Sequence, residues 1–486
     1  MGRTEGHRAV LDHHGDSGAG GSFESETAVM LAEHMADRWN RQAGPAGATP
    51  ARVLVLGMGA TGASCARFLA ARGVSAQFAD TRAVPPRRAE ILDAMPGASL
   101  QSGGPDLALA DSIETVVVSP GVPLDLPVLE QARRQGLRIV SDIDLFREHC
   151  RVPLIAVTGS NGKSTVTSML GAALRTAGWD VRIGGNLGQP ALDLLDPAAE
   201  AYVLELSSFQ LERSGRLDAQ AAVILNLSPD HLDAHADLAS YGDAKLRIYD
   251  GCEHAVVNRD QPVAPALSGA VTGFTLHEPA PGDFGLRVHD GKAYLAVGEA
   301  LLLPVDELGV SGRHNVANAL AALALGAAIG VDLQGMVAGL RRFTGLPHRM
   351  QQVCSEQGVT WIDDSKATNV AAAIASIQSV DGPLVLIAGG DAKGADFVAL
   401  ADALRARGDS VAVLLGCDRE RLANALDGVC AVQLADDMAA AVAIARSLAK
   451  PGTTVLLAPA CASLDMYTDY AARGDAFVAA VTGGRE

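Results

Sequence analysis

The segment LIAVTGSNGKSTVTSML, residues 154–170, decides the fold of the middle of this 486-residue chain. The apolar run at 154–157 predicts a short buried strand, and the turn formers around Gly159 and Gly162 predict a tight loop. Apolar residues at helical spacing from Val166 onward predict a helix. This order suits a phosphate chain, because the helix N-terminus offers unpaired backbone N–H groups and the positive end of the macrodipole.

The polar side chains of this loop strengthen the phosphate-binding interpretation. Lys163 adds a positive charge, and Ser164 or Thr165 offers a hydroxyl to a magnesium ion bound to the phosphates. The full GxxxxGK[ST] pattern is not met, because Val157 stands where its first glycine belongs, and only GxxGK[ST] remains. Taken alone, the segment also fits an ordinary glycine turn followed by a lysine-bearing helix.

Length and charge bound the function class. A chain of 486 residues predicts about three domains. The formal net charge of -17 argues against a general binder of nucleic acid or anionic membranes, so we expect small-molecule partners. No apolar run is long enough to span a bilayer, and residues 1–49 lack the pattern of a signal peptide, so we expect a cytoplasmic protein without membrane insertion. We interpret residues 1–49 as a mobile extension.

The seven cysteines are scattered and never occur in CxxC spacing. This pattern indicates neither a disulfide framework nor a zinc site, and it fits a reducing compartment.

Several apolar runs end abruptly in small or polar residues. They begin at Val53, Thr115, Tyr202, Ala221, Pro383, Ser410 and Thr454. Continuous Val/Leu runs that alternate with helical segments predict an α/β fold with parallel sheets covered on both faces. Ligands of such sheets collect beyond the carboxyl ends of the strands, so the residues after each run are the candidate site residues.

The first run leads into a GxGxxG pattern at Gly57, Gly59 and Gly62, and Asp80 closes the next strand. This spacing is typical of dinucleotide binding, in which the glycines admit a diphosphate and the acid accepts from a ribose hydroxyl. Arg82 suits a phosphate or a nucleotide edge as well as a surface ion pair. A nicotinamide cofactor is one ligand that the pattern allows, so a nucleotide-dependent oxidoreductase is one candidate function.

Acidic and imidazole side chains follow two further runs. Glu205 ends one of them, and Asp230 and His231 follow another in NLSPDH. Together with Ser164 they could ligate magnesium that bridges nucleotide phosphates. The alternative is structural, with Asp230 capping a turn and His231 bonding a buried carbonyl.

Many ordered motifs from about residue 50 to 477 resemble those of the Mur ligases. They are GMGATG with ADTR, VSPG, TGSNGKST, GGNLG, ELSSFQLE, DHLD, GDAKLRIY, GRHNVANAL, GLPHRM, DDSKATNV, GGDAKGADF and APACASLD. The resemblance implies a Rossmann-like UDP-binding domain over 50–145, a central P-loop ATPase-like domain over 146–346, and a Rossmann-like amino-acid-binding domain over 347–486. The family's phosphate loop has the same shortened form, and its first glycine pattern serves UDP instead of NAD.

The resemblance also implies an activity and a set of contacts. The activity is ATP-dependent addition of D-glutamate to UDP-N-acetylmuramoyl-L-alanine through an acyl phosphate, since the D-N-P-R motif of the relatives that add diaminopimelate or lysine is absent. The implied ATP contacts are Gly159, Asn161, Gly162, Lys163, Ser164, Thr165, Asn318, Arg349 and Asp364. The implied UDP-substrate contacts are Thr61, Asp80, Thr81, Arg82 and Gly121, with Asn186, Gln210 and His231 nearer the muramoyl-alanine. Lys163, His231 and Lys245 are the implied catalytic residues.

Lys245 depends most on the resemblance. By sequence alone a lysine among other charges on a helix is a solvated surface residue. The matching lysine of the Mur ligases is carbamylated, which turns a cation into a carboxylate-like ligand. We therefore expect two magnesium sites, drawing on Ser164, Glu205, His231 and Lys245.

The resemblance places Thr368, Lys393, Ser463 and Tyr470 around D-glutamate, with tyrosine where the family often has phenylalanine. A helix that begins near Ser463 would offer N–H groups to a substrate carboxylate. Lys393 could instead be an ordinary loop lysine, and Ser463 a simple helix cap.

Three substrates on separate domains predict a closing motion, with joints near 142–151 and 344–348, in a protein that we expect to be a monomer. A non-catalytic nucleotide-gated binding protein is a further candidate, although the retained Lys163, Glu205, His231 and Lys245 argue against it.

Overall fold

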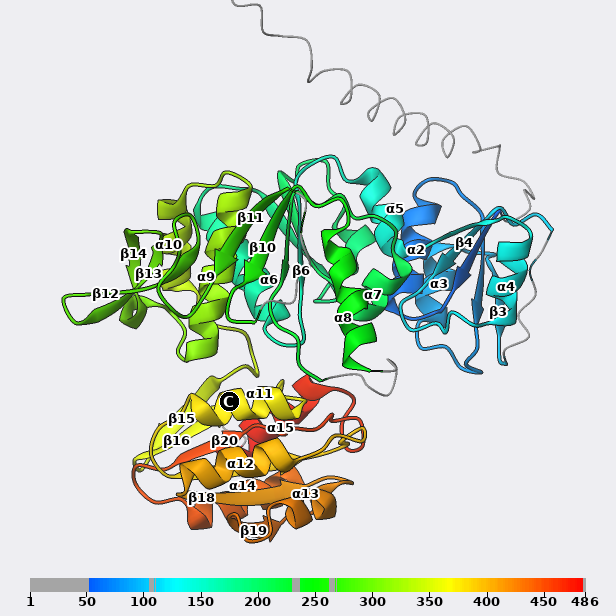
Figure 1. Ribbon diagram of the computed structural model, residues 1–486. Coiled ribbons are helices and arrows are strands. Elements are labelled where there is room, and N and C mark those ends of the chain that lie inside the picture. Colours follow the sequence, from blue (N-terminus) through cyan, green and yellow to red (C-terminus); the bar gives the residue numbers. More distant parts are fainter. Residues whose placement is uncertain are drawn as a thin grey trace, which may run out of the picture.

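The computed structural model describes residues 52–104, 109, 111–229, 237–261, 267 and 269–483. These residues form three α/β units, each built on its own sheet. Figure 1 shows the blue-to-cyan unit and the green unit side by side, with the yellow-to-red unit next to the green one. The predicted extension at 1–49 and the predicted ligand His231 lie outside the described residues.

The first unit is a parallel five-stranded sheet in the order β3-β2-β1-β4-β5. Its elements are β1 (Val53–Leu56), α2 (Ala60–Ala70), β2 (Ala76–Asp80), α3 (Arg88–Ala94), β3 (Ser99–Ser102), β4 (Thr115–Val118), α4 (Pro127–Arg134), β5 (Arg138–Val140) and α5 (Asp142–His149).

The second unit is a nine-stranded sheet in the order β14-β13-β12-β11-β10-β9-β6-β8-β7. Its strands are β6 (Leu154–Thr158), β7 (Val181–Gly185), β8 (Ala201–Glu205), β9 (Ala221–Ile224), β10 (His254–Asn258), β11 (Ala270–Phe274), β12 (Phe284–His289), β13 (Lys292–Val297) and β14 (Ala300–Pro304). Its helices are α6 (Lys163–Thr176), η1 (Ala191–Leu194), α7 (Ser208–Arg213), α8 (Leu238–Leu246), η2 (Arg247–Tyr249), η3 (Val305–Glu307), α9 (Arg313–Ala328) and α10 (Leu333–Arg342).

The third unit is a six-stranded sheet in the order β15-β16-β20-β17-β18-β19. Its strands are β15 (Gln351–Glu356), β16 (Val359–Asp363), β17 (Leu384–Gly389), β18 (Ser410–Leu415), β19 (Ala431–Leu434) and β20 (Thr454–Leu457). Its helices are α11 (Val370–Gln378), α12 (Val398–Arg407), α13 (Arg419–Ala425), α14 (Met438–Leu448) and α15 (Tyr470–Thr482).

The predicted α/β class is confirmed, and every apolar run named above is a strand: β1, β4, β8, β9, β17, β18 and β20. Two antiparallel additions were not predicted. The strands β12, β13 and β14 extend the central sheet as a meander, and β15 pairs antiparallel with β16.

The first two units share a hydrophobic core. Val53 and Val55 of β1 point into the same cluster as Leu154 of β6 and Tyr202 of β8, while the alternate β1 side chains enter a separate cluster on the other face. Phe146 of α5 packs edge-on against Tyr202, with ring centroids 5.0 Å apart. Removal of a buried phenylalanine ring of this kind typically costs about 3–5 kcal/mol. The shared core therefore fixes one unit against the other.

The helix α5 occupies the first of the two expected joints. A capping box between Ser141 and Asp144 starts it, and Arg147 Nε donates to Leu217 O of the central unit at 2.8 Å. The second expected joint, 344–348, lies in the coil after α10, where His348 adopts a φ of 59°. The first joint is thus mostly helical, with coil only at 150–151, whereas the whole of 344–348 lies outside helices and strands, between the central and third units.

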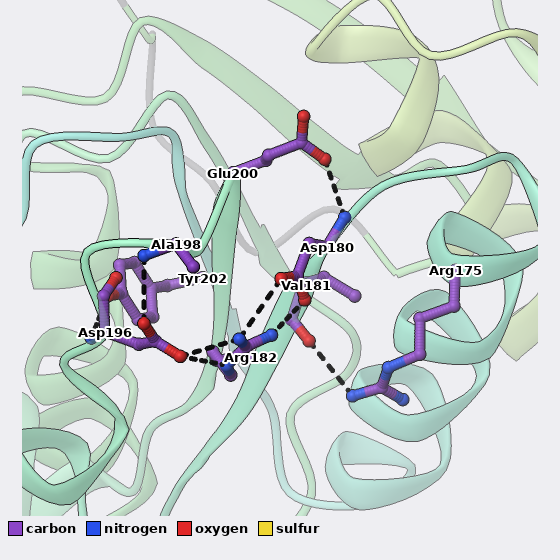
Figure 2. A network of polar contacts seen from close by, with 8 residues as sticks. All are labelled: Arg175, Asp180, Val181, Arg182, Asp196, Ala198, Glu200 and Tyr202. Atoms are coloured by element: carbon purple, nitrogen blue, oxygen red, sulfur yellow. Dashed lines mark hydrogen bonds and ion pairs between the residues drawn. The ribbon is translucent and has the colours of Figure 1, made fainter.

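A polar network at the amino ends of β7 and β8 orients the edge of the central sheet (Figure 2). Arg182 bridges Asp180 and Asp196, and Tyr202 Oη accepts from the backbone N–H of Asp196 at 2.9 Å. Asp180 N donates to Glu200 Oε2 at 2.7 Å. These contacts secure β7, whose opposite end carries residues of the site.

Among the described helices, none has both the length and the apolar composition that crossing a membrane requires.

Candidate active site

The phosphate loop joins β6 to α6 as predicted. Gly162 adopts a φ of 84° at the N-cap of α6, and a Cβ there would lie 2.7 Å from Asn318 Oδ1, so only glycine fits. Lys163 Nζ donates to the carbonyls of Gly159 at 2.9 Å and Ser160 at 2.8 Å. The ammonium group is therefore held over the loop, next to the first-turn N–H groups of α6, where a phosphate chain would bind.

Residues after β9 hold this loop in place. Asn226 Oδ1 accepts from Asn161 N at 2.9 Å, and Asn226 Nδ2 donates to Asn161 O at 3.0 Å. Ser160 Oγ donates to Ser228 O and accepts from Ser228 N, each at 2.9 Å. The loop is thus preorganised by polar side chains, which the sequence analysis did not single out.

A cavity of about 570 Å³ opens beside the phosphate loop, between the second and third units. It is lined by Asn161, Gly162 and Thr165, by Asn318 of α9, and by Arg349 and Asp364 from the third unit. The structure thus brings predicted ATP residues from both units to one cavity, within the usual size range of ligand sites.

The charged groups of this cavity influence each other. Burial raises the pKa of Asp364 to about 6, although the Ser376 hydroxyl and the Arg349 guanidinium lower it. Burial likewise lowers the pKa of Arg349, which the charges of Glu205, Asp364 and Tyr470 partly offset. The positive charge of Arg349 therefore interacts electrostatically with a carboxylate of the central unit and one of the third unit.

Glu205 and Lys245 are both buried near the base of the phosphate loop. Glu205 Oε1 accepts from Asn186 Nδ2 at 2.7 Å, and its Oε2 has no hydrogen-bond partner among the described residues. Lys245 Nζ lies 3.5 Å from Thr158 Oγ1 and 4.4 Å from the centre of the Tyr241 ring. Lys245 is only 1% exposed, so the structure contradicts the solvated-surface alternative for this lysine.

A second cavity, of about 630 Å³, lies between the first and second units. All seven predicted UDP-substrate residues in the described chain line it: Thr61, Asp80, Thr81, Arg82, Gly121, Asn186 and Gln210.

Asp80 organises the end of this cavity that belongs to the first unit. Its carboxylate accepts from Met58 N at 2.7 Å and from the backbone and guanidinium of Arg82 at 2.6–2.9 Å. Burial alone would raise the pKa of Asp80. The hydrogen bonds from Arg82 and Met58 together outweigh burial, so the pKa lies below its ordinary value. Because the carboxylate is already satisfied, it is poorly placed to bind a ribose hydroxyl as a nicotinamide-binding acid would.

Gln210 has a structural bond in addition to its place in the cavity. Its Oε1 accepts from Ser207 N at 3.0 Å in the capping box that starts α7. The amide nitrogen of Gln210 is the group left to face a ligand.

The loops carrying Lys393 and Ser463 are joined in the third unit. Asp391 and Ala462 form an antiparallel bridge, with N–O distances of 2.8 and 3.0 Å. The expected helix near Ser463 is wrong: Ser463 O accepts from Tyr467 N in a turn, and α15 begins at Tyr470. The reason is that Asp469 is the effective N-cap, accepting from Ala472 N at 2.8 Å.

Tyr470 contacts the loop that follows β16. Its ring lies 3.9 Å from Lys366 Nζ, and its carbonyl accepts from Ser365 Oγ at 2.8 Å. Thr368 lies in the loop that precedes α11, two residues from Lys366. The added tyrosine hydroxyl is near Arg349, whose pKa it influences.

The side chains at the cavity beside the phosphate loop that the sequence analysis did not identify include Asn226, Asn315 and Ser376. Asn315 Oδ1 accepts from Asn318 Nδ2 at 3.1 Å on one face of α9. Its spacing of three from Asn318 within GRHNVANAL is the signal that could have identified it. Asn226 contacts Asn161 across 65 residues and Ser376 donates to Asp364 across 12, so neither contact has a helical spacing that would mark it in the sequence.

The predicted metal ligands are only partly described. Ser164 and Glu205 are buried in the central unit, and His231 lies outside the described residues. Within the described chain, no three histidine, cysteine or acidic side chains group closely enough to hold a metal by themselves.

Three family models match the chain in order. They describe a Mur ligase MurD-like N-terminal domain at 51–141, a Mur ligase middle domain at 157–326, and a Mur ligase glutamate ligase domain at 348–461.

Full-length relatives show the same similarity. The UDP-N-acetylmuramoylalanine–D-glutamate ligase of Methylococcus capsulatus is 47% identical over 437 residues, covering 88% of this chain and 94% of that protein. Its counterpart in Nitrosococcus oceani is 48% identical over 439 residues, covering 88% and 96%. A solved UDP-N-acetylmuramate-alanine ligase of Thermotoga maritima shares the fold, with a TM-score of 0.57 at 19% identity, covering 89% of this chain and 100% of that one.

Proposed function

The chain belongs to the Mur ligase family, and from this premise we propose how its two cavities share the work of amide formation. The protein is an ATP-dependent ligase that adds D-glutamate to UDP-N-acetylmuramoyl-L-alanine in peptidoglycan precursor synthesis, the activity for which relatives at 47% and 48% identity are named. The oxidoreductase alternative leaves the phosphate loop unexplained. The observation that carries the proposal is the ATP cavity, where the phosphate loop meets Arg349 and Asp364.

Activation of the acid comes first. A carboxylate is a poor electrophile, so an oxygen of the L-alanyl carboxylate attacks the γ-phosphorus of ATP and ADP leaves. Lys163, above the loop, neutralises charge on the transferring group. The helix N-terminus and Arg349 add positive potential on either side of the cavity.

Amide formation follows. The nitrogen of D-glutamate attacks the acyl carbon, phosphate leaves, and the amine loses a proton. We assign the carboxylates of D-glutamate to Thr368, Lys393, Ser463 and Tyr470, supported by the bridge that joins the loops of Lys393 and Ser463. His231, in the segment after β9, is the proposed proton acceptor.

Mur ligases use ATP with Mg²⁺, and the residues present fit the ion. Glu205 Oε2 is a buried carboxylate oxygen without a described hydrogen-bond partner, which is a donor that magnesium prefers. We propose that Ser164, Glu205 and Lys245 hold two ions. His231 can ligate an ion only while it is not the proton acceptor, because a neutral imidazole has one free lone pair. When bound, the two magnesium ions would neutralise negative charge on the phosphates.

Lys245 would serve as a carbamate. Its neutral amine attacks the carbon of CO₂, forming an N–C bond with loss of a proton. Burial of the amine supports this assignment, because desolvation favours the neutral, nucleophilic form.

The seven cysteines are free thiols, which supports a cytoplasmic location. We also propose that the protein is a monomer.

The test is ADP release with UDP-N-acetylmuramoyl-L-alanine in three reactions: D-glutamate, L-glutamate and no amino acid. We expect release that depends on D-glutamate in the wild type and is lost in Lys163→Ala. Equal release with L-glutamate would contradict the assigned amino acid, and no release in any reaction would contradict the ligase.

A further inference from the structure

We propose that Arg213 is a positioning residue for the UDP-linked substrate, because it ties a wall of the UDP cavity in the first unit to the helix that carries Gln210. Arg213 is the last residue of α7 in the central unit. Its Nη2 donates to the carbonyl of Val122 in the first unit at 2.7 Å. The inference rests on the proposed function of this cavity.

The acceptor belongs to a turn that shapes the cavity. The turn runs from Ser119 to Val122, closed by Val122 N donating to Ser119 O at 3.0 Å, and its residues line the cavity. A Cβ on Gly57 would lie 2.8 Å from Ser119 and 3.1 Å from Val122, so this turn packs directly on the glycine loop. A shift of Val122 would therefore alter the space left for the diphosphate.

The donor is fixed as firmly as the acceptor. The Arg213 side chain is 8% exposed, and its Nη1 donates to Phe209 O at 3.0 Å and to Glu212 Oε2 at 2.9 Å. Gln210 is three residues earlier, on the same turn of helix. A guanidinium held in this way transmits the position of α7 to the turn of the first unit.

The geometry predicts which ligands depend on this bond. The proposed uridine contacts, from Asp80 to Arg82 and Gly121, lie in the first unit, while Asn186 and Gln210 lie in the central unit. UDP alone needs only the first set. The full substrate reaches both, so only its binding requires the correct spacing between the units.

A matched arginine crosses the same boundary elsewhere. Arg147 Nε donates to Leu217 O at 2.8 Å, but neither residue lines the cavity. Arg147→Met therefore removes a comparable bond between the units at two residues that do not line the cavity.

The experiment compares Arg213→Met, Arg213→Lys and Arg147→Met in steady-state kinetics and in calorimetric binding of UDP and of UDP-N-acetylmuramoyl-L-alanine. For Arg213→Met we expect KM for the UDP-substrate to rise about tenfold, as for loss of a charged hydrogen bond, with kcat, KM for ATP and the Kd of UDP within about twofold. Arg213→Lys should recover part of the loss, and Arg147→Met should lower Tm with KM unchanged.

The proposal would be overturned if KM of Arg213→Met for the UDP-substrate stayed within twofold of wild type, or rose no more than KM of Arg147→Met. A loss of UDP affinity as large as the loss of affinity for the full substrate would also overturn it. If Arg213→Met does not fold, Arg213→Gln, which keeps polarity but cannot span the distance, replaces it. A wild type that binds UDP but shows no ligase turnover would instead contradict the proposed function.

Discussion

Asn369 Nδ2 of the third unit donates to Asn161 Oδ1 of the phosphate loop at 3.2 Å. Asn369 also caps α11, its Oδ1 accepting from Ala372 N at 2.9 Å. One side chain thus starts a helix of the amino-acid unit and contacts the loop assigned to ATP. We expect this contact to couple nucleotide binding to the placement of the third unit.

Asn369→Ser should separate these two roles. Serine is also a good N-cap, so the helix is retained, but its side chain is too short to reach Asn161. We expect KM for ATP to rise about threefold to tenfold, the value for one hydrogen bond, with Tm nearly unchanged. Asp437→Ser, a cap exchange at α14 away from the site, is the control and should leave KM for ATP as in the wild type.

Glu205→Gln tests the buried carboxylate. The substitution preserves shape and the Oε1 that accepts from Asn186, but it removes the charge at the unpartnered Oε2. We expect turnover to fall at least about a hundredfold, as for loss of a group that stabilises transition-state charge, with Tm equal or higher. Glu200→Gln, at the other end of β8, should retain activity, and a fully active Glu205→Gln would refute the metal assignment.

The parts of this fold that sequence predicts are those with local causes. The run before Gly159 must be a buried strand because it is apolar without interruption, and Gly162 must tolerate a positive φ because it caps α6. The strands β12 to β14 were not predicted because many of their residues are only partly buried or exposed, so they lack a continuous apolar run. Their antiparallel pairing follows from the tight turns that join them.

The parts of the site that sequence does not predict depend on distant partners. Asn226 holds Asn161 from 65 residues away, and Arg213 reaches Val122 across 91 residues. Neither contact has a periodicity or a motif of its own. At Ser463 a local pattern gave a wrong prediction. A serine after a strand is typical of a helix start, but the helix begins later because Asp469 caps it.

Lys245→Ala should abolish turnover and respond to added carboxylates. If a carbamate on Lys245 supplies negative oxygens, removal of the side chain leaves a buried space that acetate or formate can enter. We expect partial recovery of ADP release with millimolar acetate or formate and none with chloride at equal ionic strength. Lys163→Ala is the control, because an anion cannot replace its cation. Full activity of Lys245→Ala without any additive would contradict the carbamate.

Asp142→Asn should stabilise the protein, and more so at higher pH. Burial raises the pKa of Asp142 to about 7 from its ordinary value of 3.8, its Oδ1 has no hydrogen-bond partner among the described residues, and the charge of Asp144 adds to the shift. The folded state binds this proton more tightly than the unfolded state. Ionisation of Asp142 therefore lowers the free energy of unfolding, by an amount that grows from about pH 4 to pH 7 and then levels off.

The Asn variant removes this penalty, so its advantage over the wild type should be about 2–3 kcal/mol larger at pH 8 than at pH 5, read as a larger gain in Tm at pH 8. Asp144→Asn is the matched control on the same helix. Its carboxylate accepts from Ser141 N and Gly215 N, each at 2.7 Å, so its loss should lower Tm. A gain for Asp142→Asn that is the same at both pH values would show that the buried carboxyl does not titrate between them.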